Sequence, residues 1–168
     1  MIQKKICMVG VFGTGKTSLV QRYVRSIFSP SYLSTVGVKI DRKEIVVGGQ
    51  DVHLMLWDLE GRDAHHDVNT SYLKGAAGII YVVDGTRAET LPETQAIRQR
   101  VISAIGAVPS VLALNKADLV GEWALPPDDA LTGSSAEWRV VRTSAKSGAG
   151  VDAMFQWVAE SVTGTQET

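Results

Sequence analysis

Residues 10–17 match the pattern G-x-x-x-x-G-K-[ST] without a mismatch. Glycines in this spacing let the backbone curl so that successive N–H groups point at one polyphosphate. Lys16 adds a positive charge at the terminal phosphates, and the hydroxyl of Thr17 can ligate Mg²⁺. The segment therefore predicts a site for a nucleoside polyphosphate with magnesium. Its expected binding residues are Gly10, Gly13, Thr14, Gly15, Lys16, Thr17 and Ser18.

Two later segments carry groups that can recognise a purine base. Asn115-Lys116-Ala117-Asp118 reads as N-K-x-D. The Asp118 carboxylate can accept two N–H bonds from guanine, and adenine offers no such pair. In the segment Thr143-Ser144-Ala145-Lys146, a backbone N–H can reach the guanine oxygen and the lysine stem can cover the ring. We therefore expect guanine specificity, and an ATP-specific enzyme is disfavoured.

A further segment, Asp58-Leu59-Glu60-Gly61, reads as D-x-x-G after a strand-like run. The carboxylate of Asp58 can hold Mg²⁺ through water, and the N–H of Gly61 can approach a terminal phosphate. Alone the tetrapeptide is weak, because aspartate and glycine after a strand commonly form a simple turn. It gains weight because all of these motifs follow apolar runs in a consistent order.

The residues between the motifs predict alternating strands and helices. Gly48 and Gly49 predict a hairpin, and Pro92 fits the opening turn of a helix. Such alternation predicts an α/β sheet with helices on both faces, whose ligands gather at the carboxyl ends of the strands. Residues 119–136 read as loop-rich with at most a short helix. We expect strands at 5–9, 38–47, 52–57, 78–83, 111–114 and 138–142, and helices at 17–24, 89–105 and 151–162.

Composition predicts one domain over residues 1–168, large enough to bury a core. The formal net charge of −1 gives no electrostatic reason to expect a nucleic-acid partner. Cys7 is the only cysteine, so it is expected to be a buried small hydrophobe. No apolar run has the length of a membrane span, and the polar start is unlike a secretory signal. The expected location is cytoplasmic.

With its motifs in this order, the chain resembles a Ras-superfamily small GTPase, closest to the Rab branch. Residues 32–38 resemble the first switch segment of Rab proteins, and residues 56–58 and 71–78 resemble the region around the second switch. The resemblance implies a P-loop NTPase fold of the small G-domain type, with a six-stranded, mostly parallel sheet. It implies GTP, GDP and Mg²⁺ as ligands, and a monomer whose effectors and regulators bind segments 28–38 and 58–74.

The resemblance also implies roles for single residues. Phe28 would stack against guanine, and Thr35 would ligate Mg²⁺ together with Thr17 and Asp58. Lys116 would pack along the phosphate loop. Asn115, Asp118, Ser144, Ala145 and Lys146 would hold the base, and Lys16, Thr35, Gly61 and Arg62 form the expected catalytic set.

The second switch departs from the family pattern D-x-A-G-Q. Arg62 replaces the glutamine that orients the attacking water, and Glu60 replaces the small alanine. A guanidinium has no acceptor, so Arg62 cannot take a hydrogen bond from that water, although it could neutralise phosphate charge. Glu60 could position water or repel the phosphate, or the two residues could pair with each other or with solvent. We expect slow hydrolysis.

Phe12 and a histidine pair are further departures. Phe12 stands where the family has a small residue, so its ring either crowds the path of an activating arginine or turns outward onto residues such as Tyr32. His65 and His66 could replace the missing glutamine; a metal site is the less favoured reading, because adjacent loop residues rarely share one ion. His53 is expected to be structural.

The sequence ends at Thr168 without the cysteines that carry lipid in Rab proteins. Either a tail follows in the intact protein, or this is a naturally soluble relative, as some prokaryotic Ras-like GTPases are. We expect no direct membrane anchor in this chain. Two functions stay open: a slow GTPase that ends a signal, and a near-inactive GTP-binding scaffold. Arg62 and Phe12 favour the scaffold, whereas the intact magnesium and guanine motifs favour the enzyme.

Overall fold

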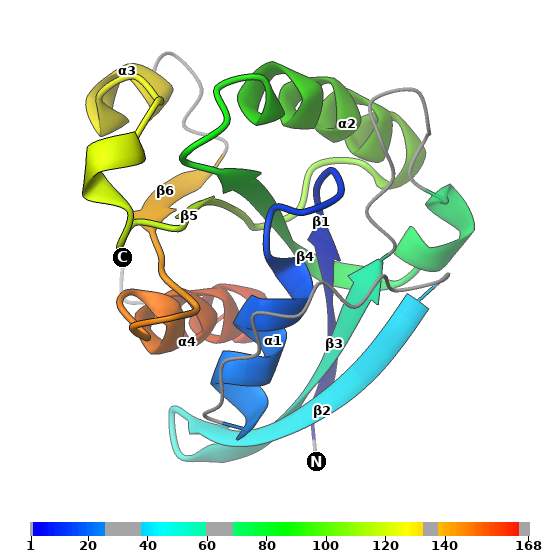
Figure 1. Cartoon of the computed structure of the whole chain (residues 1–168). Helices are drawn as coiled ribbons and strands as arrows, with labels where there is room; N and C mark the ends of the chain where they lie inside the picture. Colours follow the sequence, from blue (N-terminus) through cyan, green and yellow to red (C-terminus); the bar gives the residue numbers. More distant parts are fainter. Residues whose placement is uncertain (1, 26–37, 60–68, 133–137, 165–168) are drawn as a thin grey trace.

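A six-stranded sheet forms the centre of the computed structural model, which describes residues 2–25, 38–59, 69–132 and 138–164 (Figure 1). The strand order is β2-β3-β1-β4-β5-β6. All neighbouring strands run parallel except β2, which is antiparallel to β3. The expected six-stranded, mostly parallel sheet is confirmed. The strands are β1 (Ile2–Val9), β2 (Val38–Val47), β3 (Gln50–Leu59), β4 (Ala76–Asp84), β5 (Ser110–Asn115) and β6 (Arg139–Arg142).

Helices cover both faces of this sheet (Figure 1). Buried side chains of α1 and α4 pack on one face, and those of α2 and η1 pack on the other. The short α3 is the small helix that the loop-rich segment allowed. The helices are α1 (Lys16–Arg25), α2 (Thr90–Ile105), α3 (Asp128–Thr132) and α4 (Val151–Thr163), with 3₁₀ turns η1 (Thr70–Leu73) and η2 (Val120–Glu122).

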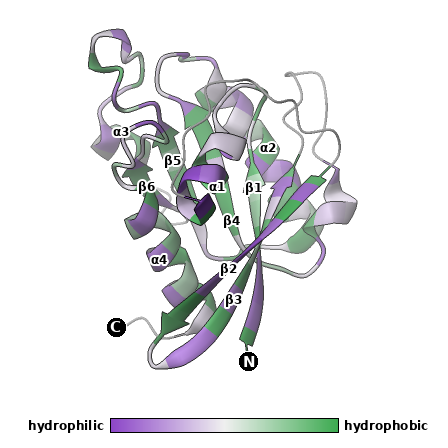
Figure 2. Ribbon diagram, turned by 60° about the horizontal axis from the view of Figure 1, so that its bottom comes forward, coloured by the Kyte–Doolittle hydropathy of each residue, from purple (hydrophilic) through white to green (hydrophobic). Residues whose placement is uncertain are grey.

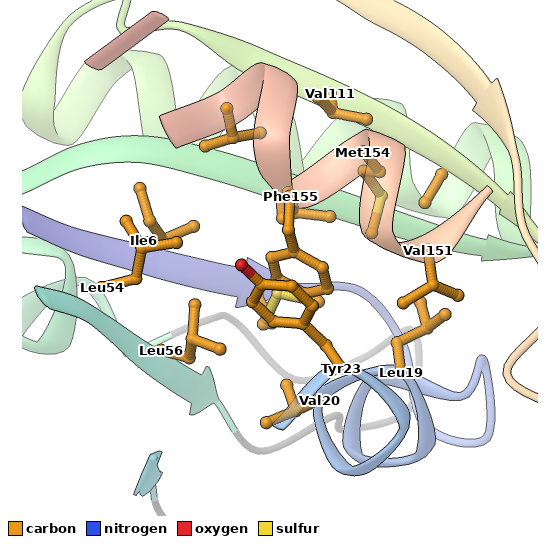
Figure 3. Close-up of a cluster of buried hydrophobic side chains, with 14 of the residues drawn as sticks. Ile6, Leu19, Val20, Tyr23, Leu54, Leu56, Val111, Val151, Met154 and Phe155 are labelled. Atoms are coloured by element: carbon orange, nitrogen blue, oxygen red, sulfur yellow. The ribbon is translucent and has the colours of Figure 1, made fainter. Parts of the chain in front are cut away.

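The two hydrophobic clusters follow from the alternation of side chains along each strand. In β1, Ile6 and Met8 enter one cluster, whereas Cys7 and Val9 enter the other. Strands covered on both faces need mostly apolar residues, so β4 is largely green in Figure 2, whereas β2 and β3 alternate green with purple. In the first cluster, the ring of Tyr23 from α1 stacks on that of Phe155 from α4, with centroids 4.0 Å apart (Figure 3).

The β2–β3 hairpin turns at Gly48 and Gly49, whose φ angles are 56° and 80°. Two consecutive positive φ angles are what a tight two-residue hairpin turn requires, so the glycines fix the register. Pairing extends from Val47↔Gln50 to Val38↔Leu59. The third strand is therefore longer than the expected residues 52–57. Backbone pairing continues through Gln50, Asp51 and Asp58, whose polar side chains interrupt the apolar pattern.

The parallel strands bring the sequence motifs to one edge of the sheet. The loop at residues 10–17 follows β1, and the N-K-x-D segment begins at the end of β5. Asp58 lies near the end of β3, and Asp84 ends β4. Within the described ranges, none of the helices has the length and apolarity that crossing a bilayer requires.

Candidate nucleotide-binding site

The glycines of the phosphate loop (residues 10–17) meet two different steric demands. Gly13 and Gly15 have φ angles of 80° and 100°, which side chains on L-residues rarely allow. A β-carbon on Gly10 would lie 2.4 Å from the carbonyl oxygen of Val82. The loop therefore needs glycine both for its turn and for its close approach to β4.

Lys16 is buried at the start of α1, with its ammonium inside the loop. Its Nζ donates to the carbonyl oxygens of Gly10 (3.0 Å) and Val11 (3.2 Å). Burial lowers the pKa of Lys16 from 10.5 to about 8; the negative charge of Asp58 opposes this shift, and the positive charge of Arg87 adds to it. A polyanion beside this ammonium would supply the counter-charge that the buried lysine needs.

Thr17 and Asp58 place two oxygen ligands side by side. The Thr17 hydroxyl donates to Oδ2 of Asp58 over 2.5 Å, although the residues are far apart in sequence. Asp58 is buried, because β3 lies next to β1 and carries it to the loop. A hydroxyl and a carboxylate are hard oxygen donors of the kind Mg²⁺ takes alongside phosphate oxygens. These residues fit a magnesium ion.

Asn115 ties the phosphate loop to the loop that follows β6. Its Nδ2 donates to the Thr14 carbonyl (2.9 Å), and its Oδ1 accepts from the Thr143 hydroxyl (3.1 Å). Ala117 N donates to the Thr143 carbonyl (3.0 Å). One amide side chain thus joins three loops that are distant in sequence.

The structure joins two further residues that the sequence predicts at the base site, Asp118 and Ser144. The exposed Asp118 accepts a hydrogen bond from the Ser144 hydroxyl (2.7 Å), which itself accepts from Ser147 N (3.0 Å). Ala145 is buried, whereas Lys146 is exposed. One oxygen of Asp118 is thereby oriented by Ser144, so the carboxylate has a defined direction.

Asp84, which belongs to no motif, contacts three polar side chains. Its carboxylate accepts from Thr86 (2.7 Å), Arg87 (3.1 Å) and Lys116 (2.7 Å). Burial alone would raise the pKa of Asp84, but hydrogen bonds from Lys116 and Thr86 hold it below its ordinary value. Lys116, with φ 67°, also donates to the Gly13 carbonyl (3.1 Å), along the phosphate loop. The only sequence signal was an aspartate that ends an apolar strand.

The family model described as the Ras family matches residues 5–164, which is nearly the whole chain. The chain belongs to the Ras family.

Among curated relatives, this Ras-family chain is 29% identical to Ras-related protein Rab-13 of Canis lupus familiaris over 160 residues, covering 94% of this chain and 79% of that protein. It is 30% identical to Ras-related protein Rab-1 of Theileria annulata over 161 residues, covering 94% and 73%. It is 35% identical to Ras-related protein Rab-32C of Dictyostelium discoideum over 121 residues, covering 71% of this chain and about half (54%) of that protein. The Rab-like resemblance is confirmed.

Several expected residues of this Ras-family chain lie outside the described ranges, so their roles stay predictions. Phe12 is described, and it is half exposed with its backbone carbonyl accepting from Arg87 (2.9 Å). His53 is buried on β3, with its Nε2 3.5 Å from Glu44. The residues outside are Phe28, Tyr32, Thr35, Glu60, Gly61, Arg62, His65 and His66.

Proposed function

We propose that this protein is a guanine-nucleotide switch, which binds GTP and GDP with Mg²⁺ and hydrolyses GTP slowly within one G-domain over residues 1–168. The observation that carries the proposal is the junction at Asn115, which couples the phosphate loop to the segments bearing Asp118 and Ala145. The phosphates of a nucleoside polyphosphate would lie at the phosphate loop, and its base would lie at the segments bearing Asp118 and Ala145.

The phosphate end would be bound by the loop amides, the Lys16 ammonium and the magnesium ligands. Thr17 and Asp58 are already in contact, and Thr35 would complete the protein ligands. When bound, Mg²⁺ neutralises charge on the phosphate oxygens. Lys16 would exchange its contacts with Gly10 and Val11 for phosphate oxygens, because an anion is a stronger acceptor than a carbonyl.

The base end would be selected by Asp118. Its carboxylate is held by Ser144 and lies exposed, available to the two adjacent N–H groups of guanine. Ala145, through its backbone N–H, and Lys146, through its stem, would complete the base site. Lys116 and Asn115 would hold the loop that presents Asp118.

The two versions of this function differ in the rate of GTP hydrolysis. Arg62 lacks the acceptor that a positioned water requires, so intrinsic hydrolysis would be slow. The alternative is a near-inactive scaffold that stays in one nucleotide state. Lys16 and Thr17 favour the enzyme, because both groups that hold the terminal phosphate and the metal are present.

Partners would bind beside the two switch segments, 28–38 and 58–74. Ile40 on β2 is 46% exposed and pairs across the hairpin with Trp57. The ring of Trp57 lies 6.5 Å from that of Tyr72. This strip of large apolar groups, which adjoins the two segments in the sequence and includes Tyr72 of the second, would bind effector or regulator proteins in a nucleotide-dependent way, the chain itself being a monomer.

The test is a change of base specificity. Asp118→Asn replaces an acceptor with an amide that can donate to the extra carbonyl of xanthine, so affinity should move from GTP to xanthosine triphosphate. The matched control is Asp51→Asn, which changes an exposed aspartate in the β2–β3 hairpin. Competition against a fluorescent guanine nucleotide measures both variants. Equal binding of ATP and GTP by the wild type would contradict the proposal.

A further inference from the structure

Three side chains hold three consecutive carbonyl groups of the phosphate loop. Arg87 Nη2 donates to the carbonyl of Phe12 (2.9 Å). Lys116 Nζ donates to that of Gly13 (3.1 Å), and Asn115 Nδ2 to that of Thr14 (2.9 Å). The loop is therefore braced, peptide by peptide, from two neighbouring strand ends.

This bracing fixes the direction of the next three amides. In a trans peptide the carbonyl and the following N–H point in opposite directions, and the described chain has no cis bond. Carbonyls 12, 13 and 14 point toward their braces, so the N–H groups of residues 13, 14 and 15 point away from them. Successive N–H groups aimed at one side form an anion-binding concavity.

Arg87 is the brace that no motif contains. Asn115 and Lys116 belong to N-K-x-D, but Arg87 follows β4 in the segment Asp84-Gly85-Thr86-Arg87. Asp84 orients it, accepting from Arg87 Nε (3.1 Å) while accepting from Lys116 (2.7 Å). One buried carboxylate thus positions two of the three braces.

The Arg87 guanidinium also lies close to the loop itself. A β-carbon on Gly13 would be 3.3 Å from Nη2, so the guanidinium lies directly against this glycine. Its position is thus at the phosphate loop, and not at the distant surface of α2.

We propose that Arg87 is a positioning residue for the nucleotide phosphates: by holding the Phe12 carbonyl, it aims the Gly13 N–H at the bound anion. This inference rests on the proposed function. Without Arg87, the Phe12–Gly13 peptide is free to rotate, and the anion must order it at the moment of binding. Loss of one charge-assisted brace at a partly exposed site should speed nucleotide dissociation about 5- to 30-fold.

The test combines a rate with a spectroscopic signature. Arg87→Gln and Arg87→Lys are compared with wild type, and Arg139→Gln on β6 is the control for losing a surface arginine. Stopped-flow measures release of fluorescent GDP, and ¹H–¹⁵N NMR of the GDP complex reports the Gly13 amide. In wild type this proton should be strongly deshielded by the phosphate. Arg87→Gln should release GDP faster and shift the Gly13 proton toward ordinary values.

Arg87→Lys should be intermediate in both measurements, because it keeps the charge but lacks the planar fork that contacts Asp84 and Phe12 together. Arg139→Gln should match wild type. Unchanged release in Arg87→Gln would overturn the inference and leave the proposed function intact. Faster release with an unmoved Gly13 amide would also overturn it, because only charge would have been lost. Failure of wild type to bind GDP would instead overturn the proposed function.

Discussion

The side-chain amide of Asn115 fills the space where a β-carbon of Gly15 would lie: an atom built there would be 2.2 Å from Nδ2. The same Nδ2 donates to the carbonyl of Thr14. The phosphate loop and the N-K-x-D segment are thus in contact through a glycine and an amide. Changes on either side should affect the other.

Gly15→Ala should therefore destabilise the protein and abolish tight nucleotide binding. The φ of 100° costs a side chain about 1–2 kcal/mol, and the clash with Asn115 costs about 1–3 kcal/mol more. Urea unfolding measures the loss. Gly49→Ala is the matched control, because its φ is 80° but nothing lies within 4 Å of the added carbon. That control should lose only the conformational part and bind nucleotide normally; equal losses in both variants would contradict the contact.

Thr17→Asn should uncouple nucleotide release from magnesium. The Thr17 hydroxyl lies against Asp58, and an amide at this position presents a longer, differently directed oxygen. Magnesium affinity of the nucleotide complex should fall by roughly 10–100-fold or more, as for loss of groups that support a metal. Removing Mg²⁺ with a chelator should speed GDP release in wild type, and have little further effect in the variant. A chelator response identical in both proteins would contradict the assignment.

Arg62→Gln, combined with Glu60→Ala, should raise single-turnover GTP hydrolysis. Glutamine offers an acceptor to the attacking water and arginine does not, and positioning this water contributes roughly 10²-fold or more. His65→Ala and His66→Ala serve as comparisons. If wild type already matches the glutamine variant and a histidine variant is slow, that histidine positions the water. Absence of hydrolysis in every protein would favour the scaffold.

The sequence predicted the elements whose residues carry a local signal. Gly48 and Gly49 marked the hairpin because a tight turn needs positive φ at both positions. The spacing of Gly10, Gly15 and Lys16 predicted the phosphate loop, because its steric and electrostatic reasons lie within one segment. These features were readable because each depends on neighbours along the chain.

The contacts of Asp84 and Arg87, which depend on neighbouring strands, were not predictable. Arg87 contacts Phe12 because β4 lies beside β1, with Val9 registered against Tyr81, and no local pattern encodes that adjacency. Asp84 looked like the polar end of an apolar strand, yet it holds both Arg87 and Lys116. The strand register brings Arg87, which reads in the sequence as a surface residue, against the phosphate loop.

The thiol of Cys7 should be unreactive in the native protein. Cys7 lies in β1 with no exposed surface, and its Sγ is 3.8 Å from the Tyr72 carbonyl oxygen. Burial raises its pKa from 9.0 to about 11, so at about pH 8 it has almost no thiolate to attack a disulfide reagent. Native labelling should be slow, whereas one thiol per chain should react promptly in concentrated guanidinium chloride.

The same shift predicts a pH dependence of stability. The folded state keeps the Cys7 proton while the unfolded chain loses it, so the stabilising contribution is complete below pH 9.0 and is lost as pH rises toward about 11. Comparing the free energy of unfolding of wild type with that of Cys7→Ala across this range isolates the thiol from the buried tyrosines. The unfolding free energy of wild type should fall relative to that of Cys7→Ala as pH rises. Rapid labelling of the folded protein, or a difference in unfolding free energy that does not change with pH, would contradict the burial of the Cys7 thiol.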